Sequence, residues 1–322
     1  MYKRQIAHTL RHQFGIGSSG PGKDVVSYIT TGHYLLPMLF YGTIAADGVF
    51  FPANASSTAA ELARQLEQGS SKLLICTEDT KDVAVAAAKV VGLDISRILV
   101  LPACGAWRLW SPSRCANVLS QQTLSWRRVT DPKELEESLV ILIYSSGTTG
   151  LPKGVKLSQT NVVAQCMMVC TRFRIHYPGF EYRLLAHLPT AHIAGIMGYF
   201  AIPFYFGGTM YWMRQFNFPE FLEYSRKYAI TFMISVPPVY LLIAKSPLVK
   251  NHFDAVQYAT SCAASMGPEL QREVGPKLGK GTVALDQSYG LSETGGLVTA
   301  KPPELECVVG SVNCLLPGLE AR

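Results

Sequence analysis

Short apolar runs alternate with amphipathic stretches along most of the chain. A short apolar run predicts a buried strand, and apolar residues at helical spacing predict a helix. In the first part of the chain the predicted strands are 25–29, 48–51, 72–76 and 97–101, and the predicted helices are 34–46, 58–68 and 81–91. Ser57 is expected to cap the helix at 58–68, with Glu61 placed to complement its dipole. Strands that are apolar on both faces are typical of a parallel sheet covered by helices.

The alternation is interrupted once and then resumes. Residues 103–138 mix Pro, Ser, Trp and Arg without a clear period, which is typical of a connection over the surface. After it, the predicted strands are 139–144, 183–187, 209–212, 231–234, 255–260 and 282–285, and a helix is predicted from 159 to about 171. We therefore expect two α/β subdomains with mainly parallel sheets covered by helices, at 1–102 and 139–322, joined by the connecting region 103–138. The second subdomain would contain the nucleotide-binding loop described below.

Composition adds limits to this picture. The chain has 322 residues, of which 48% are apolar and 16% charged, and this is an ordinary globular composition. The net charge of +6 is spread over small clusters and forms no basic stripe, so we expect no nucleic-acid partner. The eight cysteines lack the spacing of a metal site and are expected to be reduced thiols in an intracellular protein.

The longest uncharged stretch is 184–213, which is long enough to span a bilayer. Pro189, Pro203 and the pair Gly207–Gly208 interrupt it, so a buried strand–helix–strand passage is expected and no transmembrane segment. The N-terminus lacks the apolar core of a signal peptide. We expect an intracellular location, cytosolic or peroxisomal, since no targeting signal is visible.

The most informative stretch is 145–154, which directly follows the apolar run 139–144. Its glycines permit close approach of the backbone to a ligand, and its hydroxyls and Lys153 add donors and a positive charge. A surface turn is the alternative, but such a turn rarely combines so many donors with a lysine. A kinase or other P-loop NTPase is excluded, because the spacing of Lys153 does not fit a Walker A loop. We predict polyphosphate binding by Ser145, Ser146, Gly147, Thr148, Thr149, Gly150 and Lys153.

Residues 145–158 resemble the signature loop of the adenylate-forming (AMP-binding) superfamily, most closely that of 4-coumarate–CoA ligases and related acyl-CoA synthetases. Four further segments are similar to motifs of this family and occur in the family's order: 41–49, 188–193, 261–265 and 287–294. The resemblance covers residues 10–322. It implies the fold of the large N-terminal part of an adenylate-forming enzyme.

The resemblance also implies roles for single residues. Family enzymes join a carboxylic acid to AMP with release of pyrophosphate, and then exchange AMP for CoA. Lys153 and the loop before it would contact the β- and γ-phosphates, and Glu293 would be the Mg²⁺ ligand. His192 would border the acyl carboxylate, so that His192, Glu293 and Lys153 form the expected catalytic set. The expected nucleotide-binding residues outside the loop are Ala263, Gln287, Ser288, Tyr289, Gly290 and Ser292.

Three of these roles are specified further by the resemblance. Tyr289 would offer an aromatic face to adenine, Ala263 would lie in the small-residue strand end against which adenine rests, and Ser292 would lie nearest the α-phosphate. Because the attacking carboxylate and the phosphate are both negative, positioning and positive charge must supply most of the catalysis. His187 has no matching motif position and is expected to be structural.

The acyl pocket is expected around 193–199, Ala263 and Leu297. Ala194 and Gly195 stand where many arene-specific relatives carry a larger aromatic group, so a roomier or longer acyl pocket is our hypothesis. The chain departs from the family pattern at three places. Cys262 replaces a glycine and is expected to crowd the adenine edge, Asn313-Cys314 replaces a glycine–basic pair, and Gln215 replaces a basic CoA-binding residue.

The family's Thr-Gly-Asp ribose motif and its C-terminal domain with a catalytic lysine are absent from this sequence, and the N-terminus begins later than in full-length relatives. We therefore expect the 322-residue chain to bind ATP weakly at best and to make no acyl-CoA at a useful rate. Two functions remain open. One is an ATP-dependent acyl- or aryl-CoA ligase, incomplete as given, that uses ATP, Mg²⁺, CoA and a small carboxylic acid. The other is a catalytically inactive nucleotide- or acyl-binding remnant.

Overall fold

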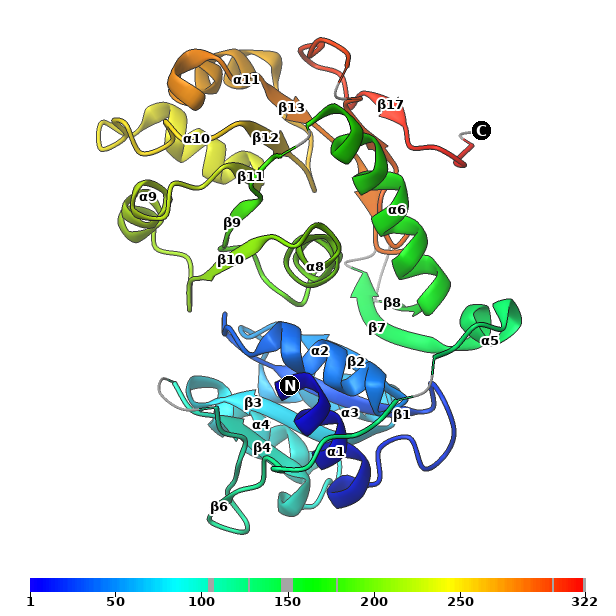
Figure 1. Ribbon diagram of the computed structural model, residues 1–322. Coiled ribbons are helices and arrows are strands. Elements are labelled where there is room, and N and C mark those ends of the chain that lie inside the picture. The colour runs from blue at the N-terminus through cyan, green and yellow to red at the C-terminus, as the bar shows by residue number, and fades with distance from the viewer. Residues whose placement is uncertain (104–106, 127, 146–152, 178, 303, 321–322) are drawn as a thin grey trace. The chain divides into compact units, whose positions relative to one another are not determined.

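A computed structural model describes residues 1–103, 107–126, 128–145, 153–177, 179–302 and 304–320 (Figure 1). The chain forms two compact units. The first comprises residues 1–161 and 189–192, and the second comprises 162–188 and 193–322. Both contain parallel strands with helices between them, which confirms the predicted α/β fold with mainly parallel sheets.

The first unit is built on one sheet of eight strands, in the order β6-β5-β4-β3-β1-β2-β7-β8. Its parallel strands are β1 (Asp24–Ile29), β2 (Gly48–Ala53), β3 (Ser71–Thr77), β4 (Ile98–Leu101) and β7 (Leu139–Ser145). Its antiparallel strands are β5 (Trp110–Ser111), β6 (Ala116–Asn117) and β8 (Lys153–Ser158). Strands β1, β2 and β4 are buried along their whole length, as apolar runs in a covered parallel sheet should be.

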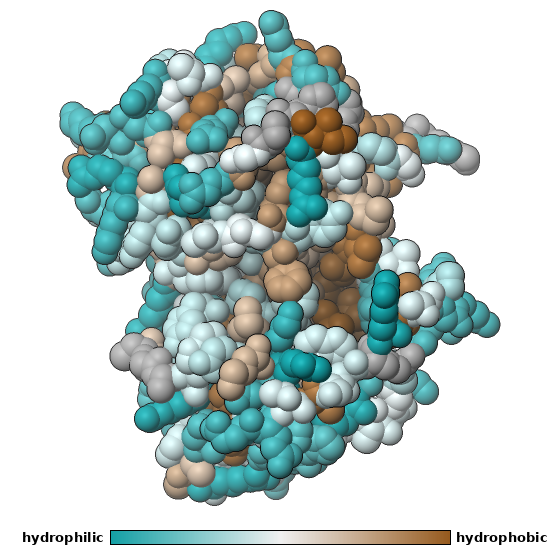
Figure 2. Space-filling view, viewed as in Figure 1, coloured by the Kyte–Doolittle hydropathy of each residue, from teal (hydrophilic) through white to brown (hydrophobic). Residues whose placement is uncertain are grey.

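Helices cover both faces of this sheet. The helices of the first unit are α1 (Tyr2–Phe14), α2 (Leu36–Ala45), α3 (Ala59–Gln68), α4 (Lys81–Val90) and α5 (Pro132–Glu137). Helices α3 and α4 pack in the same apolar cluster as Ile29 of β1. The next side chain, Tyr28, points to the opposite face, where its hydroxyl bonds that of Thr43 in α2 (2.6 Å). The visible surface of this unit is mostly polar, with apolar residues scattered over it (Figure 2).

Two local details differ from the expectations. Helix α3 is capped by Thr58 and not by Ser57: the Thr58 hydroxyl accepts from the Glu61 N–H (3.3 Å), and the Glu61 carboxylate accepts from the Thr58 N–H (2.8 Å). This capping box requires the hydroxyl residue three positions before the acid, which only Thr58 satisfies. Helix α1 was not predicted, although Ile6, Leu10 and Phe14 are buried along one side of it.

The division into units differs from the predicted one. The sequence placed 139–322 in a second subdomain. In the structure β7 pairs with β2 and β8 pairs with β7, so this hairpin completes the first sheet. Strand pairing joins residues that are far apart along the chain, and the local apolar pattern does not specify the partner.

The second unit contains several small sheets. Parallel pairing joins β9 (Arg183–Ala186) to β10 (Thr209–Trp212), and joins β11 (Phe232–Ser235), β12 (Tyr258–Ser261) and β13 (Leu285–Gln287). Two antiparallel pairs follow: β14 (Gly290–Leu291) with β15 (Gly296–Leu297), and β16 (Thr299–Ala300) with β17 (Cys314–Leu315). The helices are α6 (Gln159–His176, of which the first turn belongs to the first unit), α7 (Ile193–Ile196), α8 (Ile202–Phe206), α9 (Phe218–Lys227), α10 (Pro237–Lys245) and α11 (Pro268–Val274).

Helices α9, α10 and α11 pack with the strands in one apolar cluster that includes Phe221, Tyr240, Val274 and Leu285. Between α7 and α8 the chain forms a π-helical segment, Met197–Ala201. The long uncharged stretch thus folds as strand, helix and strand, as predicted. In the part of the chain that the structure describes, no helix is long and apolar enough to cross a membrane.

Candidate functional site

The predicted phosphate loop connects the two strands of the β7–β8 hairpin. Ser145 at the end of β7 lies opposite Lys153 at the start of β8, so the hairpin brings both ends of the loop together. Lys153 is exposed, which leaves its ammonium group accessible to an anion. Ser146, Gly147, Thr148, Thr149 and Gly150 lie outside the described residues.

The other predicted motifs follow two neighbouring strands of the second unit. Strands β12 and β13 are parallel, so their carboxyl ends meet at one edge of the sheet, where ligands bind in many α/β proteins. The backbone there is joined across the strands, since the Ser288 N–H donates to the Ser261 carbonyl (2.9 Å). Residues 261–265 and 287–294 therefore lie side by side, as two parts of one site must.

Ala263, just past the end of β12, has an unusual backbone conformation. Its φ of +72° lies in the left-handed region, which residues other than glycine rarely adopt, and the residue is exposed. Such strain persists where the surrounding structure imposes it, and it concentrates at ligand sites. The preceding Cys262 is buried, and its thiol faces the Ser235 carbonyl (3.8 Å). The thiol is therefore part of the interior, while the neighbouring Ala263 is exposed.

Tyr289 is an exposed aromatic side chain on a well-held backbone. The side chain is 46% exposed. Its N–H donates to the Thr299 hydroxyl (3.0 Å), and its carbonyl accepts from the N–H groups of Val298 (2.8 Å) and Thr299 (3.0 Å). A ring exposed from a fixed backbone provides a surface on which a base can stack.

Gly290 allows the tight hairpin that follows. A Cβ atom at this position would lie 2.3 Å from the Gly296 carbonyl oxygen, so only glycine permits this approach of β14 to β15. Ser292 and Glu293 lie in the turn of this hairpin. Ser292 is buried and its carbonyl accepts from the Gly295 N–H (3.1 Å), whereas Glu293 is exposed.

Among the described residues, Glu293 belongs to no cluster that could hold a metal ion by protein ligands alone. The described residues contain no group of three His, Cys, Asp or Glu side chains that could hold a metal ion. Mg²⁺ typically binds one or two carboxylates together with substrate phosphates. A single exposed carboxylate beside a nucleotide site fits that mode of binding.

Comparison with known proteins identifies the family of this chain. The AMP-binding enzyme family matches residues 2–322. A protein of Emericella nidulans whose name assigns it to the acyl-coenzyme A synthetases is 39% identical over 326 residues, which cover 99% of this chain and 58% of that protein. 4-Coumarate–CoA ligase 2 of Solanum tuberosum is 30% identical over 275 residues, which cover 85% of this chain and 48% of that enzyme. The chain belongs to the AMP-binding enzyme family.

Solved structures agree on the fold. The ATP-bound structure of MatB from Rhodopseudomonas palustris matches 98% of this chain and 58% of its own length, with a TM-score of 0.80 and 23% identity. Our chain therefore spans about half the length of the relatives that it matches.

Gln287 occupies a motif position, but its side chain is used inside the protein. Its amide oxygen accepts from the Met266 N–H (3.0 Å), and its amide nitrogen donates to the Gln271 side chain (3.0 Å). Gln271, in α11, also donates to the Leu285 carbonyl (2.6 Å) and accepts from the Gly310 N–H (2.9 Å). Gln271 belongs to no motif, so sequence reasoning had no signal for it. Both residues hold the strand ends in place.

Asn313 supports the same strand end from another direction. Its side-chain amide donates to the Gln287 carbonyl (2.6 Å), and its φ is +69°. Asparagine is among the few residues that adopt this backbone conformation readily, which explains how it replaces a glycine. Ser288 is buried as well, with its hydroxyl 3.1 Å from that of Thr260.

The two histidines between β9 and α7, His187 and His192, differ in their surroundings. His192 is exposed on the turn after β9 and belongs to the first unit, whereas residues 261–265 and 287–294 belong to the second. His187 is buried, and its ring nitrogens bond the Leu185 carbonyl (2.8 Å) and the Ser235 hydroxyl (2.9 Å). Burial lowers the pKa of His187 to about 4. A neutral, fully bonded ring of this kind fits the structural role expected for His187.

Proposed function

We propose that this chain carries the adenylate-forming half of an ATP-dependent acyl-CoA ligase. In the first step an oxygen of the acid's carboxylate attacks the α-phosphorus of ATP, and the bond to pyrophosphate breaks. In the second step the CoA thiol attacks the acyl carbon, and AMP leaves. The names of the relatives support this reaction class. The observation that carries the proposal is the joined ends of β12 and β13, with a strained Ala263 and an exposed Tyr289.

Each residue has a proposed task. The Tyr289 ring and the backbone around Ala263 hold adenine, and the Ser292 region faces the α-phosphate. Gln287 and Gly290 position these groups without a side-chain contact to the nucleotide. Glu293 would hold Mg²⁺, which supplies positive charge to the phosphates when it is bound.

The phosphate end of the nucleotide is assigned to the first unit. Lys153 and the loop that it closes bind the β- and γ-phosphates, where an ammonium group gives charge-assisted hydrogen bonds. His192 orients the acid's carboxylate. The small carboxylic acid and CoA are the remaining substrates.

Binding of AMP and of ATP to the purified chain tests these assignments separately. Tyr289→Ala should weaken binding of both nucleotides about 5- to 100-fold, because stacking of a base on an aromatic ring contributes ~1–3 kcal/mol. Lys153→Ala should weaken ATP binding about tenfold and leave AMP binding unchanged, since AMP lacks the β- and γ-phosphates. Isothermal titration calorimetry with Mg²⁺ present measures both.

Lys156→Ala is a matched control, because Lys156 is an exposed lysine of the same strand β8 on its opposite face. It should change neither affinity. The proposed function is contradicted if AMP binds with the same affinity to the wild type and to Tyr289→Ala, or if the two lysine variants behave alike.

A further inference from the structure

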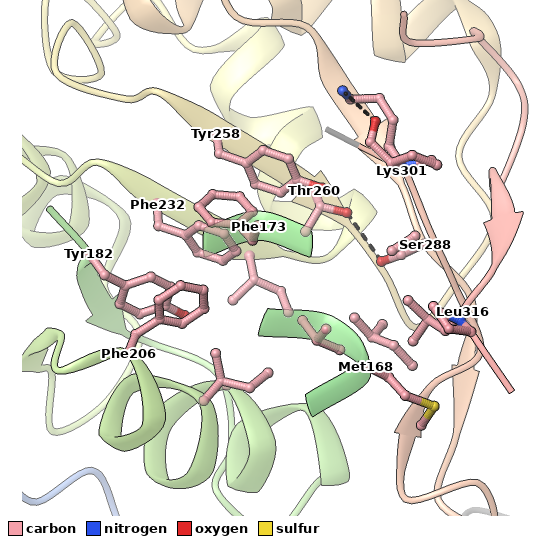
Figure 3. A pocket seen from close by; sticks show the side chains of 18 of the residues that line it. Met168, Phe173, Tyr182, Phe206, Phe232, Tyr258, Thr260, Ser288, Lys301 and Leu316 are labelled. Carbon is pink, nitrogen blue, oxygen red and sulfur yellow. Dashed lines mark hydrogen bonds between the residues drawn. The ribbon is translucent and has the colours of Figure 1, made fainter. Parts of the chain in front are cut away.

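A cavity of about 70 Å³ lies inside the second unit, beside the segment 287–294. Five aromatic side chains line one side of it and Met168 and Leu316 line the other (Figure 3). The aromatic residues are Phe173, Tyr182, Phe206, Phe232 and Tyr258. Ser288, which precedes Tyr289, and Leu297, which pairs with Gly290, also line it. The cavity therefore borders the segment that we assign to the nucleotide.

The aromatic side of the cavity is tightly packed. The Tyr182 ring stacks on the Phe206 ring (5.4 Å between centroids, 8° between planes), and Phe173 meets Phe206 edge-on (5.6 Å). Phe173 also meets Tyr258 edge-on at 5.3 Å. These rings come from α6, α8, β12 and the residue just before β9, so they form a wall held by several elements.

Three polar side chains of the wall are already paired. The hydroxyls of Thr260 and Ser288 bond each other (3.1 Å), and the Lys301 ammonium group donates to the Pro302 carbonyl (3.4 Å) (Figure 3). The same ammonium group also donates to the Leu305 carbonyl (2.9 Å). A water molecule needs two to four polar partners to occupy a cavity favourably. The lining leaves few for it, so an apolar occupant is favoured.

Gly198 opens this space. It lies in the π-helical segment Met197–Ala201, a conformation that is rare and frequent at functional sites. A Cβ atom added to Gly198 would meet one atom, Cγ2 of Ile234, at an ordinary 3.8 Å. Because Gly198 lines the cavity, any larger side chain at this position would occupy the space itself.

We propose that this cavity binds the apolar end of the acid substrate, that the acid is aliphatic, and that Gly198 determines how far its chain enters. This inference rests on the proposed function. The size of the cavity decides the class of acid: it is about half of the ~150 Å³ cavity that takes benzene. The end of a linear chain fits such a space, and a terminal phenyl ring exceeds it.

Binding of stable acyl-adenylate mimics, the acyl-sulfamoyl adenosines, tests the inference on the chain as it is. Their acyl groups would range from acetyl to dodecanoyl, with phenylalkanoyl mimics of matched carbon number. For the wild type, affinity should rise about three- to fourfold per methylene, the gain expected from burying one, and then level off once the cavity is full. The phenyl-ended mimics should bind more weakly than linear ones.

Gly198→Leu should remove this dependence on chain length and leave the affinity for AMP and for the acetyl mimic unchanged. Gly198→Ala, a smaller change that the fold tolerates more readily, should shorten the optimal chain. Phe206→Ala should move the preference toward phenyl-ended mimics. Gly275→Leu is the matched control, because Gly275 also has a helical backbone and an added Cβ meets no atom within 4 Å.

The outcomes separate the two proposals. If AMP and the acetyl mimic bind but affinity does not depend on chain length, or if Gly198→Ala and Gly275→Leu behave alike, the cavity is not the acyl-end site and the proposed function stands. Tighter binding of phenyl-ended mimics by the wild type would overturn the aliphatic class. Failure of AMP and of every mimic to bind would overturn the proposed function itself, and with it this inference.

Discussion

The two units are held together in different ways. In the first unit, parallel strands such as β1 and β2 are buried along their whole length between covering helices. The second unit is built on small sheets, and buried, hydrogen-bonded side chains such as His187 and Gln287 lie at the ends of its strands, with Gln271 of α11 bonded to Gln287. Apolar burial has no preferred direction, whereas hydrogen bonds do. The second unit therefore uses directional bonds to hold the irregular segments that carry the candidate site.

This comparison predicts that acid destabilises the second unit through His187. His187 is neutral when folded, with a pKa of about 4 against an ordinary 6.5. Below pH 6.5 the unfolded chain takes up a proton that the folded protein does not. Stability is therefore highest above pH 6.5 and falls toward pH 4, by up to about 3 kcal/mol from this residue. Urea unfolding at several pH values, with hydrogen exchange to locate the opening, measures it.

His187→Gln is the variant that isolates this contribution. It should lower stability at pH 7 but flatten the dependence between pH 6.5 and 4, because glutamine does not titrate. Equal pH dependence in the wild type and in His187→Gln would show that the buried ring is not responsible.

Replacement of Gln271 should have the next largest effect. Gln271→Leu keeps a side chain of similar size but removes the hydrogen bonds of Gln271 to Gln287, Leu285 and Gly310. Leaving buried partners unpaired costs about 1–3 kcal/mol. We expect increased hydrogen exchange at 262–267 and 306–313 and weaker AMP binding. Calorimetry of AMP binding beside urea unfolding measures both.

A purely structural role for Gln271 would lower stability and leave the AMP affinity of the folded protein unchanged. Gln271→Glu provides a second measurement, since it retains the acceptor and removes the donor. Hydrogen exchange at 306–313 should increase less in Gln271→Glu than in Gln271→Leu, because the Gly310 N–H still has its acceptor.

The smallest effect is expected in the first unit. Thr58→Ala removes the hydroxyl of the α3 capping box, which typically costs about 1 kcal/mol. The loss should be local, with α3 opening more often and nucleotide binding unchanged. Ser57→Ala is the control and should leave stability unchanged, because the Ser57 side chain is not the cap. Weaker AMP binding by Thr58→Ala would contradict the expectation that a local change in α3 leaves nucleotide binding unaffected.

The predictions from sequence succeeded where the evidence was local. The apolar runs located β1 to β4 and β9 to β13 within a few residues, because a buried strand needs apolar side chains wherever it is placed. Helix α1 was missed since His8, Arg11 and His12 give its sequence a polar appearance, while Ile6 and Leu10 form a narrow apolar side.

The candidate site shows the same limit. The stretch 145–154 was readable from its density of donors, and Tyr289 and Glu293 from their resemblance to a family motif. The support given by Gln271 and Asn313 has no such signal. Their partners lie on other elements, so nothing in the neighbouring sequence marks them.

By itself the sequence determined the α/β class, the family and the residues that offer donors, an aromatic ring and a carboxylate. Those properties depend on residue types and on spacing along the chain. Only the tertiary structure decided that the β7–β8 hairpin completes the first sheet, that Ala263 is held in a left-handed conformation and that a cavity opens at Gly198. Pairing, strain and empty space arise between residues distant in sequence, and they exist only once the chain has folded.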